Sequence, residues 1–241
     1  MRAYVPHCLV MAIAIAIPFY EEWQQALLFV FAPESGIKDF IFKQDVSFYL
    51  FSFPIYQLIQ QELLLASIVL TGALGILYLI EHRISAGRIL HWPVGPKLHL
   101  SGMVVVVALL IAWGFALERF QLLYTEEHEP QFFGPGLLET AYFLPLIWCS
   151  VLSLLGTTIA GLWFLHRRKG GWPLALLVVV FGLSIGLRHI HFIPAAFERF
   201  IVDPNPVRSE VDHMQANIDS TLRGFDLTRI TNIDVSPGLP D

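Results

Sequence analysis

The segment LHLSGMVVVVALLIAWGFAL, residues 98–117, decides the fold of this 241-residue chain. It contains no Asp, Glu, Lys or Arg. A helix of about 20 mainly apolar residues is long enough to cross the hydrocarbon core of a bilayer, which is about 30 Å thick. The segment therefore predicts a membrane-spanning helix.

Apolar segments of similar length stand on both sides of it. Those over 55–80, 137–165 and 174–201 are continuous, whereas 7–31 has a short apolar core followed by Glu21 and Glu22. A signal peptide is the alternative for 7–31, but no small-x-small cleavage site precedes its polar patch. We predict an all-α fold: a polytopic transmembrane helix bundle of about five spans, at 7–31, 55–80, 98–117, 137–165 and 174–201.

The composition agrees with lipid as the main solvent of the protein surface. Hydrophobic residues make up 55% of the chain and charged residues 15%, whereas soluble domains are about 25% charged. A net charge of −5 gives no reason to expect nucleic-acid binding, which favours clustered Lys and Arg. Cys8 and Cys149 are far apart, so they indicate neither a disulfide framework nor a zinc site.

Basic residues in the short loops predict the orientation. Arg83, Arg88 and Lys97 lie between the second and third predicted spans, and the run 166–169 (HRRK) lies between the fourth and fifth. Loops rich in Lys and Arg stay in the cytoplasm. The N-terminus is therefore expected inside, and the C-terminus outside the cytoplasm.

The sequence changes character after residue 203. Pro204 and Pro206 end the last predicted span, and residues 204–241 form an extracytoplasmic polar tail. Within the tail, 207–225 has apolar residues at the spacing of a short amphipathic helix. Such a helix needs a surface to cover: the membrane, a partner or a further domain.

Five segments, taken in order, resemble uncharacterised protein family 0182. They are FKQDVSFYLFSFP (42–54), WGFALERFQLLY (113–124), FGPG (133–136), RFIVDPNP (199–206) and NIDST (217–221). The resemblance implies a multi-spanning protein of the bacterial inner membrane. Typical members have around seven spans and then a large extracytoplasmic domain. This chain lacks the early spans, and it stops where that domain would begin. Pro206 also replaces a Glu of the family pattern, and the resemblance implies no catalytic residue.

Histidines are the candidate cofactor ligands. His99 and His166 lie at the same expected depth on neighbouring spans, and His189 and His191 lie inside the segment 174–201. Imidazoles placed in this way hold haem or chlorophyll, so a tetrapyrrole is a possible cofactor. Ordinary interfacial histidines are the open alternative. His189 and His191 are about 200° apart around a helix, so they cannot share one metal ion, and no metal site is expected.

Arg188 is a charged residue within a predicted span. It costs about 2.5 kcal/mol or more there unless it is paired or hydrated, which favours a polar contact to another helix or subunit. The pairs Glu118-Arg119 and Glu198-Arg199 occur in the related strings ALERF (116–120) and AFERF (196–200). They are either interfacial anchors or further partner contacts.

The favoured hypothesis is a non-catalytic integral membrane subunit or scaffold, in contact with lipid and with other membrane-protein subunits. A haem- or chlorophyll-binding subunit of an electron-transfer or photosynthetic complex is the first alternative, because of the histidines. A transporter is the second. Neither paired broken helices nor a buried carboxylate relay, which would favour a transporter, is evident in the sequence.

Overall fold

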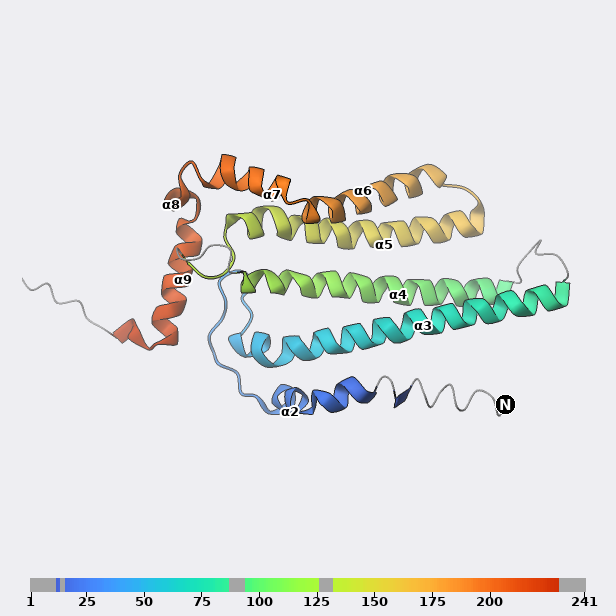
Figure 1. The fold of residues 1–241 in the computed structure, drawn as a ribbon, viewed down its shortest axis with the longest axis horizontal. Helices are drawn as coiled ribbons and strands as arrows, with labels where there is room; N and C mark the ends of the chain where they lie inside the picture. Colours follow the sequence, from blue (N-terminus) through green and yellow to red (C-terminus); the bar gives the residue numbers. More distant parts are fainter. Residues whose placement is uncertain (1–11, 14–15, 87–93, 126–131, 230–241) are drawn as a thin grey trace, which may run out of the picture.

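The computed structural model describes residues 12–13, 16–86, 94–125 and 132–229 (Figure 1). Within these ranges the structure is helical, with no β-strand beyond an isolated bridge between Lys38 and Asp45. Four helical stretches are long and apolar enough to cross a membrane: Phe48–Ile84, Val94–Tyr124, Glu139–Arg167 and Gly171–His189. The predicted all-α architecture of membrane-spanning helices is therefore confirmed.

These stretches contain the four long helices of the fold. Their bounds are α3 (Phe53–Ala86), α4 (Val94–Gln121), α5 (Leu144–Arg167) and α6 (Gly171–His189). Each packs mainly on its neighbour in the sequence, so the helices form a row in which α3 and α6 are the flanks (Figure 1). The short helix α2 (Trp23–Phe31) packs beside the start of α3.

Small residues allow the close contact between α5 and α6. Leu177 lies where a side chain on Gly156 would be, with its Cδ2 3.3 Å from the position of a Cβ atom. Ser150 and Ser184 are buried, and their hydroxyl oxygens are 3.0 Å apart. Small residues and hydroxyl pairs of this kind are typical of contacts between helices in membranes.

The two ends of the row differ in charge. At one end α3 ends, α4 begins and α5 turns into α6, and this basic end carries Arg83, Lys97 and the run 167–169. The α5–α6 turn uses left-handed backbone at Arg168 (φ 55°) and Gly170 (φ 88°). The opposite end, called the tail end here, carries α7 (Phe192–Phe197), α8 (Pro206–Ser209) and α9 (Val211–Gly224). In Figure 1, α9 lies crosswise to the long helices.

Each of three π-helical turns lies just before a proline. The turns are Phe48–Ser52, Glu139–Phe143 and Glu198–Val202, and Pro54, Pro145 and Pro204 follow each by two positions. A proline has no N–H and its ring displaces the carbonyl four residues earlier. The wider π turn moves that carbonyl away, which lets the helix approach the proline without a clash.

The last predicted span differs from the structure. We expected one helix over 174–201, but α6 ends at His189 and Ile190 has extended backbone (φ −85°, ψ 100°). Pro194 is the physical reason, since a helix that continued through it would drive its ring against the carbonyl of Ile190. Arg188 therefore lies in the last turn of α6.

Two further predicted elements differ in detail. The tail helix expected over 207–225 is divided at Glu210 into α8 and α9. The span expected over 7–31 lies partly outside the described residues, and its described part contains α2. The predicted spans over 55–80 and 98–117 each fall within one long helical stretch, and the span over 137–165 begins two residues before the stretch Glu139–Arg167.

Candidate functional site

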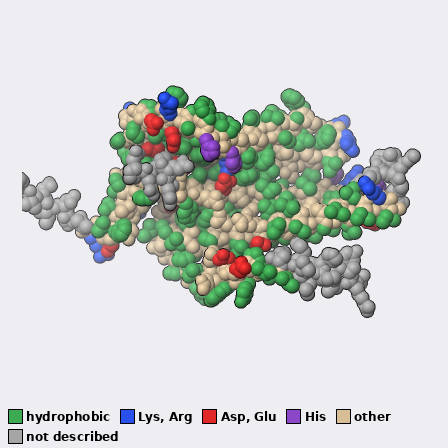
Figure 2. Space-filling view, in the orientation of Figure 1, with side chains coloured by type: hydrophobic (Ala, Val, Ile, Leu, Met, Phe, Trp, Pro, Cys, Tyr) green, Lys and Arg blue, Asp and Glu red, His purple; other side chains and the backbone are tan. Residues whose placement is uncertain are grey.

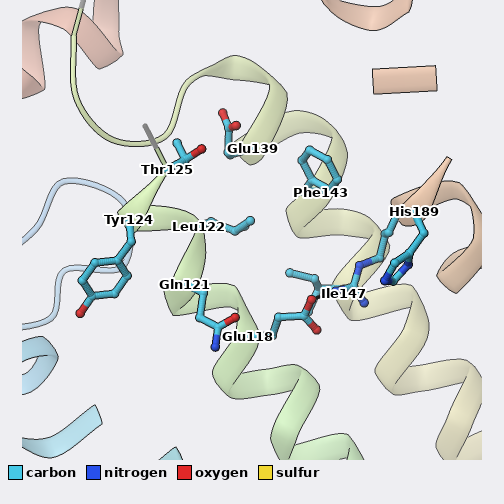
Figure 3. A pocket seen from close by; sticks show the side chains of 10 residues that line it. Glu118, Gln121, Leu122, Tyr124, Thr125, Glu139, Phe143, Ile147 and His189 are labelled. Atoms are coloured by element: carbon cyan, nitrogen blue, oxygen red, sulfur yellow. Dashed lines mark hydrogen bonds and ion pairs between the residues drawn. The ribbon is translucent and has the colours of Figure 1, made fainter. Parts of the chain in front are cut away.

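A polar cavity of about 290 Å³ lies at the tail end of the row, between α4, α5 and α6 (Figure 3). Glu118 and Gln121 line it from the end of α4, Thr125 from just beyond that helix, and Glu139 from the start of the α5 stretch. The last turn of α6 closes it. The remaining lining residues are Leu122, Tyr124, Phe143, Ile147, Arg188 and His189.

An ion pair between Arg188 and Glu118 forms one wall of the cavity. Nη2 of Arg188 donates to Oε1 of Glu118 and joins α6 to α4 across 70 positions of sequence. The Arg188 side chain is only 6% exposed, whereas that of Glu118 is 35% exposed. The guanidinium also lies 5.6 Å from the centre of the Phe115 ring. Nη1 of Arg188 is buried and has no hydrogen-bond partner among the described residues, so this donor is unsatisfied.

Local contacts fix the α5 and α6 walls of the cavity. The Tyr142 hydroxyl donates to the carbonyl of Leu187, 2.8 Å away, which satisfies one of the last carbonyls of α6. Glu139 is 2% exposed and its Oε2 accepts the N–H of Gly136 at 2.8 Å. The carboxylate thereby caps the helical stretch that it begins.

The predicted histidines separate into two pairs at opposite ends. His189 and His191 lie at the tail end and are exposed, and only His189 lines the cavity. His99 and His166 lie at the basic end, where Nδ1 of His99 is 2.8 Å from the Tyr78 hydroxyl. Among the described residues, no group of three or more His, Cys, Asp or Glu is placed to hold a metal ion. Tetrapyrrole binding stays a prediction.

Two of these rings have their Nδ1 atoms engaged by their own helices. Nδ1 of His166 is 2.9 Å from the carbonyl of Leu162, and Nδ1 of His189 is 2.9 Å from the carbonyl of Ile185. A carbonyl only accepts, so each ring donates from Nδ1. In a neutral imidazole, Nε2 then carries a lone pair. His189 therefore offers an acceptor at the cavity.

The two Glu-Arg pairs are not structurally equivalent. Arg119 does not join the cavity; its guanidinium lies 4.5 Å from the Phe120 ring centre and 5.3 Å from that of Trp148. Glu198 begins a π turn beyond α7, and Arg199 is exposed. The resemblance between ALERF and AFERF is thus one of sequence, with different surroundings.

A second polar cavity, of about 330 Å³, lies between α3 and α4 and shares Glu118 and Gln121 with the first. Its wall includes Gln60, which is 7% exposed and whose Nε2 donates to the carbonyl of Leu110 at 2.9 Å. Gly114 leaves room for this amide, since a Cβ atom there would lie 2.7 Å from Nε2. Polar groups therefore extend from α3 to α6 near the tail end.

Helix α9 is bound to the end of the row by buried polar contacts. Glu210, 2% exposed, accepts the N–H of Leu137 through both carboxylate oxygens, at 2.9 and 3.0 Å. The side-chain amide of Asn217 donates to the carbonyl of Phe133 at 2.7 Å. These contacts hold α9 crosswise at the tail end.

Asp45 organises the exposed segment before α3. Its carboxylate accepts the hydroxyl of Ser35 at 2.8 Å and the N–H groups of Gly36 and Ser47, both at 2.8 Å. Hydrogen bonds from Ser47 and Ser35 hold the pKa of Asp45 well below its ordinary value of 3.8.

Comparison with known proteins agrees with the order of motifs along the chain. Residues 1–239 match the family model described as "Uncharacterised protein family (UPF0182)". The chain belongs to this family.

Relatives in UPF0182 match nearly the whole chain. The similarity is 42% identity over 236 residues to a UPF0182 protein of Methylococcus capsulatus, covering 98% of this chain and 26% of the relative. It is 39% over 234 residues to one from Syntrophobacter fumaroxidans, covering 97% and 27%. The chain thus spans about a quarter of the length of these relatives. No solved structure matches it.

Of the site residues predicted from the sequence of this UPF0182 chain, the structure joins two to each other. Glu118 and Arg188 were each expected to meet a partner, and they pair within the chain. Contacts of Arg119, Glu198 and Arg199 with other subunits stay predictions. Sequence reasoning missed Gln60 and Gln121, although a glutamine within an apolar span is a signal that could have found them.

Proposed function

We propose that this chain is a non-catalytic scaffold of the bacterial inner membrane that packs against further protein helices. The arrangement as an open row is the observation that supports it. A closed bundle buries one face of every helix, whereas a row leaves two broad faces to be covered by lipid or protein.

The flank helix α3 is the least covered. Between residues 61 and 84 of α3 no residue is buried. A Cβ atom built on Gly72 or Gly75 would meet no atom of the described residues within 4 Å. Membrane helices associate through close packing at small residues, so this strip is suited to the approach of another helix.

The opposite flank has the same property. Gly182 and Gly186 of α6 are four positions apart, and in the described part of the chain no atom lies within 4 Å of a Cβ added to either. This is the small-xxx-small spacing at which membrane helices meet. Gly156 and Gly161 differ, because Leu177 and Leu174 already fill the space beside them. Open glycines therefore lie on both flank helices, and Gly95 and Gly102 of α4 are open as well.

Charge supports a cytoplasmic basic end and an extracytoplasmic tail end. Lys97, Arg167, Arg168 and Lys169 lie at the basic end, and short loops rich in Lys and Arg stay in the cytoplasm. On this orientation α9 and the cavity lie at the outer surface.

The test compares Gly72→Leu with Ala73→Leu in the full chain. Both add bulk to α3, but the side chain at residue 73 points about 100° away around the helix. The mass of the native complex in mild detergent is measured by light scattering. In the wild type we expect a protein mass greater than that of one chain. Gly72→Leu is expected to lose this additional mass, and Ala73→Leu is expected to keep it. A wild-type particle containing one chain and detergent alone would refute the proposal.

A further inference from the structure

The cavity between α4, α5 and α6 presents both a free donor and free acceptor groups. Nη1 of Arg188 is buried and lacks a partner among the described residues, although Nη2 is paired with Glu118. Nε2 of neutral His189 is an acceptor, because Nδ1 faces the carbonyl of Ile185. The Glu118 carboxylate, one-third exposed, is a second acceptor. A ligand that fits carries an anionic group and a hydrogen-bonding cation together.

On the membrane crossing proposed above, the cavity lies at the depth of lipid headgroups. Helix α6 has 19 residues, which corresponds to about 28 Å at a rise of 1.5 Å per residue. The hydrocarbon core of a bilayer is about 30 Å thick. Arg188 and His189 form the last turn of α6, so they lie at the boundary between acyl chains and headgroups.

Hydrophobic side chains around the cavity connect it to the lipid-facing surface of the row. Figure 2 shows histidine side chains on one broad face of the row, with an acidic side chain beside them and hydrophobic side chains around them. Ile147 and Phe143 line the cavity together with the charged groups. A ligand with a polar headgroup and acyl chains could therefore enter from the side.

We propose that this cavity binds the phosphoethanolamine headgroup of a membrane phospholipid. The phosphate accepts hydrogen bonds from Nη1 of Arg188 and from the amide of Gln121, and the ammonium donates to Glu118 and His189. The volume of about 290 Å³ is near the lower limit of ordinary ligand pockets, which suits a headgroup of this size.

Charge excludes a purely anionic lipid as the preferred ligand. Two carboxylates, of Glu118 and Glu139, line the cavity with the single guanidinium of Arg188. The guanidinium is already paired with Glu118, so an anion without an accompanying cation meets no unpaired positive charge among the described lining residues. A choline headgroup carries the two charges, but its trimethylated nitrogen has no N–H to donate to Glu118 or His189. The site therefore selects a primary ammonium.

The experiment measures lipid binding to the delipidated full chain in mild detergent by native mass spectrometry. Phosphatidylethanolamine, phosphatidylcholine and phosphatidylglycerol with identical acyl chains are titrated separately, and soluble phosphoethanolamine forms a fourth arm. We expect phosphatidylethanolamine to bind about tenfold more tightly than the other two lipids, since charge-assisted hydrogen bonds distinguish them. Equal binding of the three lipids would overturn the proposal. Binding of soluble phosphoethanolamine as tightly as the lipid would overturn the assignment to a membrane lipid.

Two variants locate the site. Arg188→Lys keeps a charge for Glu118 but loses the second guanidinium nitrogen, and Gln121→Ala leaves the ion pair intact. Each is expected to weaken phosphatidylethanolamine binding about tenfold, because each removes a hydrogen-bond donor to the phosphate. Arg199→Lys, at an exposed position of the same end, is the matched control. Unchanged phosphatidylethanolamine affinity in both cavity variants, with helix content equal to the wild type, would contradict the assignment.

Discussion

Replacing Glu118 by Gln is expected to destabilise the chain more than replacing its partner Arg188 by Gln. The two side chains form one ion pair, but they are buried to different extents, 6% exposed for Arg188 and 35% for Glu118. Glu118→Gln leaves a buried guanidinium without a counter-charge. Arg188→Gln leaves a carboxylate that water already reaches.

The magnitudes follow from this difference in exposure. Removing one partner of a fully buried pair costs 3–5 kcal/mol, and since Glu118 is partly hydrated we expect about 2–3 kcal/mol for Glu118→Gln. For Arg188→Gln the remaining charge is solvated, so about 1 kcal/mol is expected. The double variant has no unpaired charge, and its cost is expected to be about 1–2 kcal/mol below the sum of the single costs.

The assay is unfolding of the chain in mixed micelles by increasing SDS, followed by far-ultraviolet circular dichroism. The free energy of unfolding is compared for the wild type, the two single variants and the double variant. Equal costs for the two single variants, or costs that add without coupling, would refute the unequal burial of the pair.

Four further outcomes are expected. Gly114→Ala should destabilise the chain by about 1–3 kcal/mol in the same assay, because a Cβ atom there meets the amide of Gln60. Adding Gln60→Ala to this variant should restore part of the lost stability. If the double variant is no more stable than Gly114→Ala, the contact is contradicted. The folded pKa of Asp45 is lowered, so its stabilising contribution is present above pH 3.8 and is lost as pH falls through the folded pKa. Proteolysis of residues 35–47 by an acid protease should therefore increase below pH 3.8 in the wild type. In Asp45→Asn it should already be raised at acidic pH values above 3.8, and equal cleavage of the two proteins there would contradict the role of Asp45. Glu210→Gln should speed hydrogen exchange at the N–H of Leu137, which that carboxylate binds; unchanged exchange would show that α9 is held in another way. The absorption spectrum of the purified chain should lack Soret and chlorophyll bands, and a bound tetrapyrrole would favour the alternative function.

The long helices could be predicted from the sequence because lipid imposes a simple constraint. A span needs enough consecutive apolar residues and little else. The length and composition of 98–117 therefore predict a span without any knowledge of packing. The break at Ile190 was also encoded, in Pro194, but the apolar composition of 174–201 concealed it. The mean hydropathy of a segment is hardly changed by the loss of one backbone N–H, whereas the helix is interrupted by it.

The candidate site was only partly predictable. Arg188 and Glu118 stand out individually as charges near apolar segments, yet their pairing depends on the rotation of α4 and α6 about their axes, which the sequence of either helix leaves open. The same holds for Gln60, whose amide fits only because residue 114 of the neighbouring helix is a glycine. Pairings between distant segments therefore came from the structure.

The central claim, on which the scaffold and the lipid site both depend, is that the row crosses the membrane with its basic and tail ends on opposite sides. Labelling with a membrane-impermeant thiol reagent tests it most directly. Single cysteines are placed by Lys169→Cys and Ser220→Cys, which have α6 between them, in a chain with Cys8 and Cys149 replaced by Ser. In spheroplasts with a sealed inner membrane, we expect the reagent to label position 220. Position 169 should be labelled only after the membrane is permeabilised. Labelling of both positions from the same side would contradict the claim.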